Sequence, residues 1–147
     1  MTRYERKQVG WVVICGLCIA LSVVAINVRT ESSPHWEISV AVELLLLLSL
    51  AAFYKLTIKI DDHVLRISFG VGAIRKEVQL TAIDTYEPVR IRWWYGWGIH
   101  LTPYGWLYNV SGWDAVAIKL RNGKKFAIGT EESQALVEAI RRFASVR

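Results

Sequence analysis

"VGWVVICGLCIALSVVAINV", residues 9–28, is a run of twenty residues without a single charge. A helix of that length spans the hydrocarbon core of a bilayer, which is about 30 Å thick. A second apolar run, Ile38 to Tyr54, follows with Glu43 as its only charge and has Trp36 and Lys55 as interfacial anchors. A cleaved signal peptide is the competing interpretation of the first run, but the run is too long and lacks a small-x-small cleavage site. We therefore predict transmembrane helices over residues 9–28 and 37–55.

The segment between the runs, "RTESSPHW", residues 29–36, is short and polar, so it predicts an external loop that closes an antiparallel helical hairpin. The loop has only Arg29, offset by Glu31, whereas basic residues flank the hairpin at Arg3, Arg6, Lys7, Lys55 and Lys59. The positive-inside rule then places both termini in the cytoplasm. Residues 1–8 are predicted to be a cytoplasmic N-terminal segment.

Glu43 is the intramembrane polar residue, about two turns into the second predicted helix. An ionisable residue at membrane depth is a functional hypothesis, here contact with a partner subunit or the chemistry of a transporter or membrane enzyme. The alternative is a carboxyl that reaches the outer interface, or one that stays protonated against Ser39 or the first helix. Both interpretations remain open.

Small residues of the first helix suggest close packing. Gly16 and Ala20 form a small-xxx-small pair, which lets another helix approach closely, either the second helix or that of a second copy. Cys15 and Cys18 have a redox-like spacing, but an apolar helix disfavours the reactive thiolate. We interpret the two cysteines as small apolar residues.

From residue 56 the pattern changes to strict alternation. The stretches "LTIKI" (56–60), "HVLRISF" (63–69) and "AIRKEVQL" (73–80) predict a β-meander with one buried face. A fourth strand, "TYEPVRIRW" (85–93), contains Pro88 and suits an edge. Asn122–Gly123 predicts a hairpin within residues 115–130.

The end of the chain, "TEESQALVEAIRRF" (130–143), predicts an amphipathic helix with Thr130 as its N-cap. A helix with one apolar face must cover something, most simply the open end of a curled sheet. Residues 56–147 are thus predicted to form a mainly β domain of about seven strands, a partly open barrel closed by a C-terminal helix.

This order resembles the pleckstrin-homology (PH) superfold. A chain with two transmembrane helices followed by such a domain looks like the small bacterial membrane proteins with a bacterial PH-like domain. The phrases "YGWGIH", "YGWLYNVSGWDAVAIKL", "GKKFAIGTEE" and "QALVEAI" carry the resemblance. It implies a binding and assembly module of the bacterial inner (plasma) membrane, without catalytic residues. In PH domains a basic loop between the first two strands binds lipid; we align that loop with the acidic Asp61–Asp62, which disfavours phosphoinositide binding there.

Charge agrees with a membrane-associated domain. From Lys55 onward fourteen lysines and arginines stand against nine aspartates and glutamates, so this part carries the whole net charge of +5. A tethered basic domain lies against an anionic inner leaflet. No known nucleic-acid motif accompanies the charge, and we expect no nucleic-acid partner.

Five of the seven tryptophans lie in one run, "RIRWWYGWGIHLTPYGWLYNVSGW", residues 90–113. The run lacks a nucleophile elbow and metal-ligand spacing, so we expect no catalysis, metal, cofactor or small-molecule substrate. Alternating residues suit buried strands: Ile91, Trp93, Ile99, Leu101, Leu107 and Val110. Five tryptophans exceed what a small core needs. We therefore predict a membrane or partner contact made by Arg90, Arg92, Trp94, Tyr95 and Trp97.

Together these patterns predict a membrane-anchored, non-enzymatic binding module that scaffolds or regulates a membrane protein complex. Its expected partners are membrane lipids and either a membrane protein or further copies of the chain. An inner-leaflet lipid-sensing module is the alternative, and a small transporter or enzyme subunit that uses Glu43 is a further one.

Overall fold

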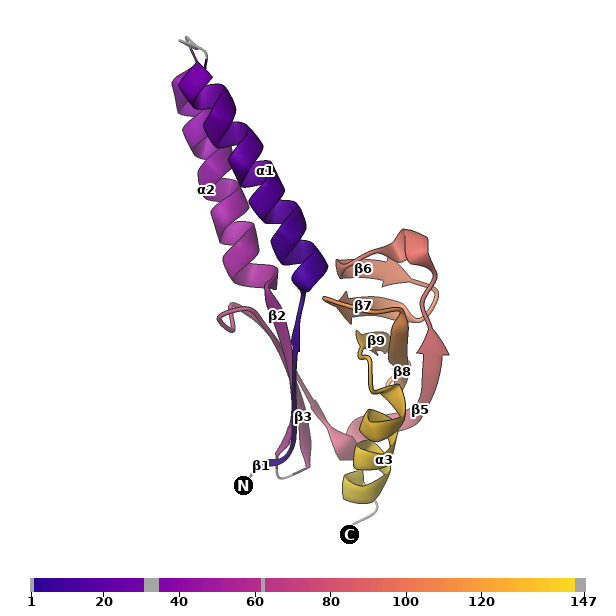
Figure 1. The fold of residues 1–147 in the computed structure, drawn as a ribbon. Helices are drawn as coiled ribbons and strands as arrows, with labels where there is room; N and C mark the ends of the chain where they lie inside the picture. Colours follow the sequence, from indigo (N-terminus) through magenta and orange to yellow (C-terminus); the bar gives the residue numbers. More distant parts are fainter. Residues whose placement is uncertain (1, 31–34, 62, 145–147) are drawn as a thin grey trace.

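A computed structural model describes residues 2–30, 35–61 and 63–144. In it two N-terminal helices stand on one end of a β domain that carries a C-terminal helix (Figure 1). The elements within the described residues are β1 Thr2–Val9, α1 Trp11–Thr30, α2 Trp36–Phe53, β2 Lys55–Asp61, β3 Val64–Phe69, β4 Ile74–Gln79, η1 Leu80–Ala82, β5 Ile83–Arg90, η2 Trp93–Tyr95, β6 Gly98–Thr102, β7 Gly105–Asn109, β8 Asp114–Leu120, β9 Lys125–Gly129 and α3 Ser133–Ala144.

Helices α1 and α2 are each long and apolar enough to cross a membrane, and neither apolar stretch buries a residue inside the protein. They pack against each other as a hairpin (Figure 1). Arg29 lies in the last turn of α1 and Trp36 begins α2. Residues 31–34, the centre of the predicted external loop, lie outside the described residues.

The first sheet has the order β1-β2-β3-β4 and is antiparallel throughout. The meander predicted over residues 56–80 corresponds to β2, β3 and β4. The sequence interpretation left residues 1–8 outside the domain, and this was wrong: β1 pairs with β2 from Val9↔Lys55 to Thr2↔Asp61. The partner strand lies more than forty residues away, beyond both helices, so local alternation could not reveal the pairing.

The second sheet has the order β5-β8-β9-β7-β6, with β7 and β9 parallel and the other pairs antiparallel. The prediction of a mainly β, partly open domain with a C-terminal helix is consistent with these two sheets, which do not close and which have nine strands among the described residues where about seven were expected. Strand β1 was not part of the predicted domain, whereas the hairpin β6–β7, between β5 and β8 in the chain, lies within residues 90–113, where buried strands were expected.

The core lies between the two sheets and under α3. Alternate residues of β2 and β3 face it, and Phe69 and Phe126 are its largest fully buried side chains. Helix α3 packs its apolar stripe of Leu136, Ala139 and Ile140 against this core. Thr130 caps the start of this segment, because its Oγ1 accepts a hydrogen bond from the Glu132 amide at 3.2 Å.

Candidate functional site

The two helices enter the domain through neighbouring strands. The Gly10 amide, just before α1, donates to the carbonyl of Tyr54, just after α2, at 2.9 Å. A side chain at position 10 would lie 3.0 Å from the Val110 carbonyl oxygen, so glycine permits this close approach. The end of the hairpin that joins the domain is thus fixed by the backbone of the first sheet rather than by a flexible linker.

The turn between β3 and β4 adds a second connection to α2. The amides of Gly70 and Val71 donate to the carbonyls of Lys55 and Ala51, at 2.8 and 3.3 Å. Gly70 has φ +52°, and a Cβ there would overlap the Ala51 carbonyl oxygen, so the turn requires glycine. Val71 is consequently held, 70% exposed, beside the end of α2.

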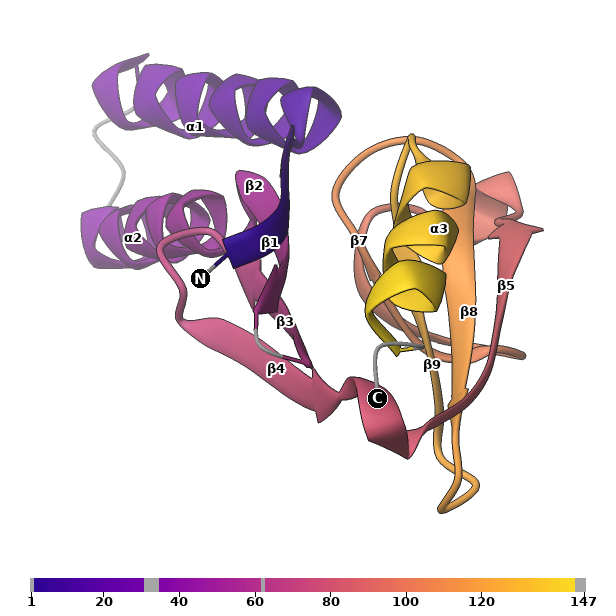
Figure 2. The same cartoon turned by 90° about the horizontal axis from the view of Figure 1, so that it is seen from below.

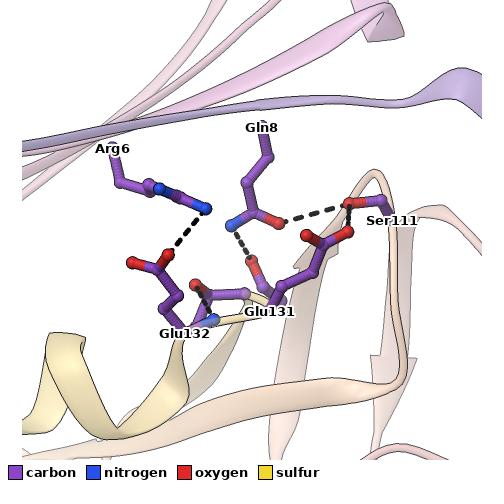
Figure 3. Close-up of polar contacts among 7 residues, drawn as sticks. Arg6, Gln8, Ser111, Glu131 and Glu132 are labelled. Atoms are coloured by element: carbon purple, nitrogen blue, oxygen red, sulfur yellow. Dashed lines mark hydrogen bonds and ion pairs between the residues drawn. The ribbon is translucent and has the colours of Figure 1, made fainter.

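Side chains of β1 also contact residues of the second sheet and residues near the start of α3, as Figure 3 shows. Gln8 is 4% exposed. Its Nε2 donates to the Gly129 carbonyl at 3.1 Å, and its Oε1 lies 3.3 Å from the Ser111 hydroxyl, whose proton is shared between Gln8 and Glu131 (Figure 3). We call these contacts, together with the Arg6–Glu132 ion pair at 2.8 Å, the β1 clasp.

The clasp also sets the electrostatics around Tyr4. Burial raises the pKa of the Tyr4 phenol, Glu132 raises it further, and Arg6 opposes the shift. The described residues offer the Tyr4 hydroxyl no hydrogen-bond partner. A side chain on the strand that leads into α1 is thus held neutral between the two sheets.

The tryptophan-rich segment divides into an exposed and a half-buried part. Arg90, Arg92 and Trp94 are exposed as predicted, and the Arg92 guanidinium lies 4.8 Å from the centre of the Trp94 ring. Tyr95 and Trp97 are half-buried. Tyr95 packs beside the buried Ile91 and Trp97 against Trp113, with ring centres 5.1 Å apart.

Trp93 is not part of the core, contrary to the alternation expected through residue 93. It is 74% exposed, and Leu101 is 67% exposed, whereas Ile91, Leu107 and Val110 are buried as expected. The reason is local: β5 ends at Arg90, and Trp93–Tyr95 forms a 3-10 turn that breaks the two-residue period. Trp93 thereby lies with the exposed residues of the predicted contact, where it lines a shallow hollow with Trp94, Trp113, Arg90, Ile91 and Arg92.

The exposed Trp93 and Trp94 lie at the end of the domain that joins α1 and α2. In Figure 1 the short turn between β5 and β6, which contains them, stands near the level of the β3–β4 turn and of the end of α1 that joins the domain. Tryptophan and arginine side chains suit the headgroup zone of a bilayer. If the helices cross a membrane, this edge of the domain meets its surface.

The outer face of the first sheet forms a polar surface beside the end of α2. Lys7, Thr57, Ser68 and Arg75 are successive neighbours across its four strands. Sequence analysis overlooked this row, since it appears only when the strand register is known. The signal was present as the polar positions of the alternating stretches.

Charges on this outer face are balanced away from the helices and unbalanced close to them. Glu5 binds Lys7 at 3.0 Å and Lys59 at 3.4 Å, and these lysines, Lys7 first, lower the pKa of the Glu5 carboxyl. By contrast, Lys55 lies 5.0 Å over the Tyr54 ring, and Arg75 donates to a backbone carbonyl at 2.6 Å. Neither forms an ion pair with any carboxylate that the structure describes. Two cations next to α2 are therefore available to an anion.

Glu43 is half-buried on the stripe of α2 that also contains Ser39, Leu46 and Leu50, the stripe that faces α1. This placement favours a carboxyl covered by the first helix over one that faces a partner.

Gly16 and Ala20 have different surroundings on α1. Ala20 is half-buried, whereas Gly16 is exposed, and a Cβ added to Gly16 would meet no atom within 4 Å. Gly16 therefore does not bring α1 close to α2. Of the two packing partners that the sequence left open, the second helix is thus not the one that Gly16 contacts, and packing of Gly16 against a second copy stays a prediction.

Across the described ranges, no group of three His, Cys, Asp or Glu side chains could hold a metal ion. Cys15 and Cys18 are both exposed on α1 and carry free thiols. Comparison with models of protein families, with curated proteins and with solved structures finds no match to this chain. The geometry of its own residues is the basis for a functional proposal.

Proposed function

We propose that the chain is a membrane-anchored, non-enzymatic binding module with a PH-like domain, which scaffolds or regulates a membrane protein complex. In this proposal α1 and α2 span the bacterial inner membrane. Both termini and the β domain lie in the cytoplasm, because five basic residues flank the hairpin, whereas its loop has only Arg29, offset by Glu31.

The observation that carries the proposal is the connection between hairpin and domain. The helices leave the sheet from adjacent strands, held by the Gly10–Tyr54 hydrogen bond. The β1 clasp then ties the same strand to the second sheet through Gln8, and through Arg6 to Glu132, the residue just before α3. A partner that shifts α1 within the membrane therefore displaces β1, and with it groups on both sheets. Such coupling suits a module that senses or organises a membrane partner.

The order of elements supports the PH-like part of the proposal. Without the hairpin β6–β7, the chain runs through β1 to β4 in one sheet, then β5, β8 and β9 in the other, then α3. Seven strands and a closing helix are what the resemblance to PH domains implies. In this alignment the first two strands are β1 and β2, so the helical hairpin replaces the loop between them. Asp61–Asp62 then joins the second and third strands, and Asp62 itself lies outside the described residues.

A second candidate function, an inner-leaflet lipid-binding module, is favoured by the cations beside α2. Lys55 and Arg75 flank the hydroxyls of Thr57 and Ser68 on the outer face, where a lipid phosphate would lie beside the end of the helix. A phosphate accepts hydrogen bonds from hydroxyls and from both cations. The double substitution Lys55→Gln and Arg75→Gln should reduce co-purifying anionic lipid. Arg121→Gln, an exposed cation on the β8–β9 turn, is the matched control.

The first experiment is affinity purification of the tagged full-length chain in mild detergent, with mass spectrometry of bound protein and lipid. The scaffold proposal predicts a membrane protein in stoichiometric amount. A matched variant carries short Gly-Ser insertions after Val9 and after Tyr54, which retain helices and domain but release the connection between them.

We expect the insertions to reduce recovery of the partner without reducing recovery of the chain itself. Equal recovery with and without the insertions would show that the connection plays no part in binding. Purification of the chain with anionic lipid and no protein would replace the scaffold proposal by the lipid-binding one.

A further inference from the structure

A groove on the open side of the domain is lined by lysines and apolar side chains. It lies where β4, the β6–β7 hairpin and the β8–β9 turn meet, and its volume is about 740 Å³. The side chains that characterise it are Lys76, Leu101, Trp106, Tyr108, Lys124 and Lys125. None of the described residues that line it is acidic, so the groove has a single sign of charge.

The floor of the groove is an uncovered part of the inner face of the second sheet. Leu101 and Trp106 lie opposite each other in the β6–β7 pair and are 67% and 51% exposed. Trp106 shares its face of β7 with Tyr108, which packs on the core, because residues two apart in a strand point the same way. The first sheet ends at β4 and leaves this apolar shelf open. Exposed tryptophan on such a shelf is typical of protein contacts.

The wall of the groove is cationic. Lys76 of β4 is half-buried, and its Nζ lies 4.6 Å from the centre of the Phe126 ring and 5.4 Å from that of Tyr108. Lys124 and Lys125 are exposed on the β8–β9 turn. In the part of the chain that the structure describes, no carboxylate forms an ion pair with any of these three lysines. A half-buried ammonium held only by ring faces gains most from an added carboxylate.

We propose that this groove binds an acidic segment of a partner protein, with a bulky apolar side chain on the shelf of Leu101 and Trp106 and carboxylates at the three lysines. The inference rests on the proposed scaffold function and specifies the chemistry of its partner. A protein segment suits the groove because one chain can supply both the apolar side chain and the carboxylates, and the β8–β9 turn that borders the groove projects sideways from the domain, where α1 and α2 do not cover it (Figure 2).

The test is a selection of random short peptides displayed on phage against the full-length chain in phosphatidylcholine nanodiscs, after depletion on empty discs. We expect enriched peptides to carry aspartate or glutamate around a bulky apolar residue. The double variant Lys124→Gln and Lys125→Gln should weaken their binding roughly tenfold, and added salt should weaken it further. Arg121→Gln removes a cation from the same turn but not from the groove, and should leave binding within about twofold.

Three results would overturn the inference. One is the absence of enrichment, or enrichment of peptides without acidic residues. Another is an equal effect of Arg121→Gln and the double variant, which would indicate attraction by net charge alone. The third is binding to phosphatidylserine vesicles that is lost in the double variant and kept in Arg121→Gln, which would make lipid the occupant.

Failure of this inference is distinguishable from failure of the proposed function. A membrane partner that co-purifies equally with the wild-type chain and with the Lys124→Gln, Lys125→Gln variant leaves the scaffold proposal standing and removes the groove from it. Lys76→Gln adds a check inside the groove, with the thermal unfolding of the variant as its folding control.

Discussion

Gln8→Ala tests whether β1 is an integral strand of the domain. Gln8 is 4% exposed and makes two hydrogen bonds across the domain, at 3.1 Å to Gly129 of β9 and 3.3 Å to Ser111 in the β7–β8 loop. Each bond contributes about 0.5–1 kcal/mol, and a buried carbonyl left without its donor adds about 1–2 kcal/mol. We therefore expect Gln8→Ala to lower the free energy of unfolding by about 2–4 kcal/mol.

The assay is urea unfolding of the full-length chain in mild detergent, followed by tryptophan fluorescence. With a slope of about 2 kcal/mol per molar, the midpoint should fall by about 1–2 M. Gln79→Ala is the matched control, because Gln79 is the exposed last residue of β4, and it should change the free energy by less than about 0.5 kcal/mol. Equal midpoints for the two variants would refute the clasp.

Three further predictions concern the β3–β4 turn beside the end of α2, the Tyr4 phenol next to the β1 clasp, and the exposed Trp93 and Trp94. Gly123→Ala should lower the free energy of unfolding by about 1–2 kcal/mol, because Gly123 has a positive φ. Gly70→Ala should lower it more, because the added Cβ would also overlap the backbone of α2, and equal melting temperatures of the two variants would contradict this. The raised pKa of Tyr4 means that the folded state keeps a proton which the unfolded state loses near pH 10, so stability should fall as pH rises above 10. Tyr4→Phe should flatten that fall in urea unfolding at alkaline pH, and an unchanged profile would assign the fall to other groups. Trp93→Ala with Trp94→Ala should reduce quenching of tryptophan fluorescence by lipids brominated near the headgroup, and undiminished quenching would place these rings away from the bilayer.

Much of the fold could be predicted wherever the pattern is local. The uncharged run at residues 9–28 and the run from Ile38 indicate two helices because length and hydropathy suffice. The alternation of Leu56, Ile58 and Ile60 indicates a strand because every second residue faces the core. Asn122–Gly123 marks its hairpin because the turn needs a positive φ, which is +83° at Gly123.

Strand β1 could not be predicted because its inward positions are polar. Tyr4, Arg6 and Gln8 face the second sheet, where the pattern of a strand would place apolar residues. Their partners, such as Ser111 and Glu132, lie about a hundred residues further along the chain. Such a strand is recognisable only once the long-range hydrogen bonds are known.

The amino-acid composition of residues 90–113 predicted that some of their aromatic side chains are exposed, but it could not predict which ones. The number of tryptophans in residues 90–113 exceeds the need of a core, and this indicates exposure without saying which rings are exposed. The 3-10 turn at Trp93–Tyr95 decides that, and it leaves Trp93 outside and Trp97 against Trp113. The row from Lys7 to Arg75 is likewise a product of strand register, which no single stretch encodes.

The most direct test of the account is the depth of a nitroxide label at position 94 in bilayer nanodiscs, in a background with Cys15→Ala and Cys18→Ala. Labels at Leu45, in the middle of α2, and at Thr81, in η1, calibrate hydrocarbon and water; η1 joins β4 to β5 at the end of the domain remote from the helices (Figure 1). Relative collision rates with oxygen and with a water-soluble nickel chelate report the depth of each label. The account predicts a value at position 94 between the two, at headgroup level. A label at 94 as accessible to nickel as the one at 81, or a label at 45 open to nickel, would contradict it.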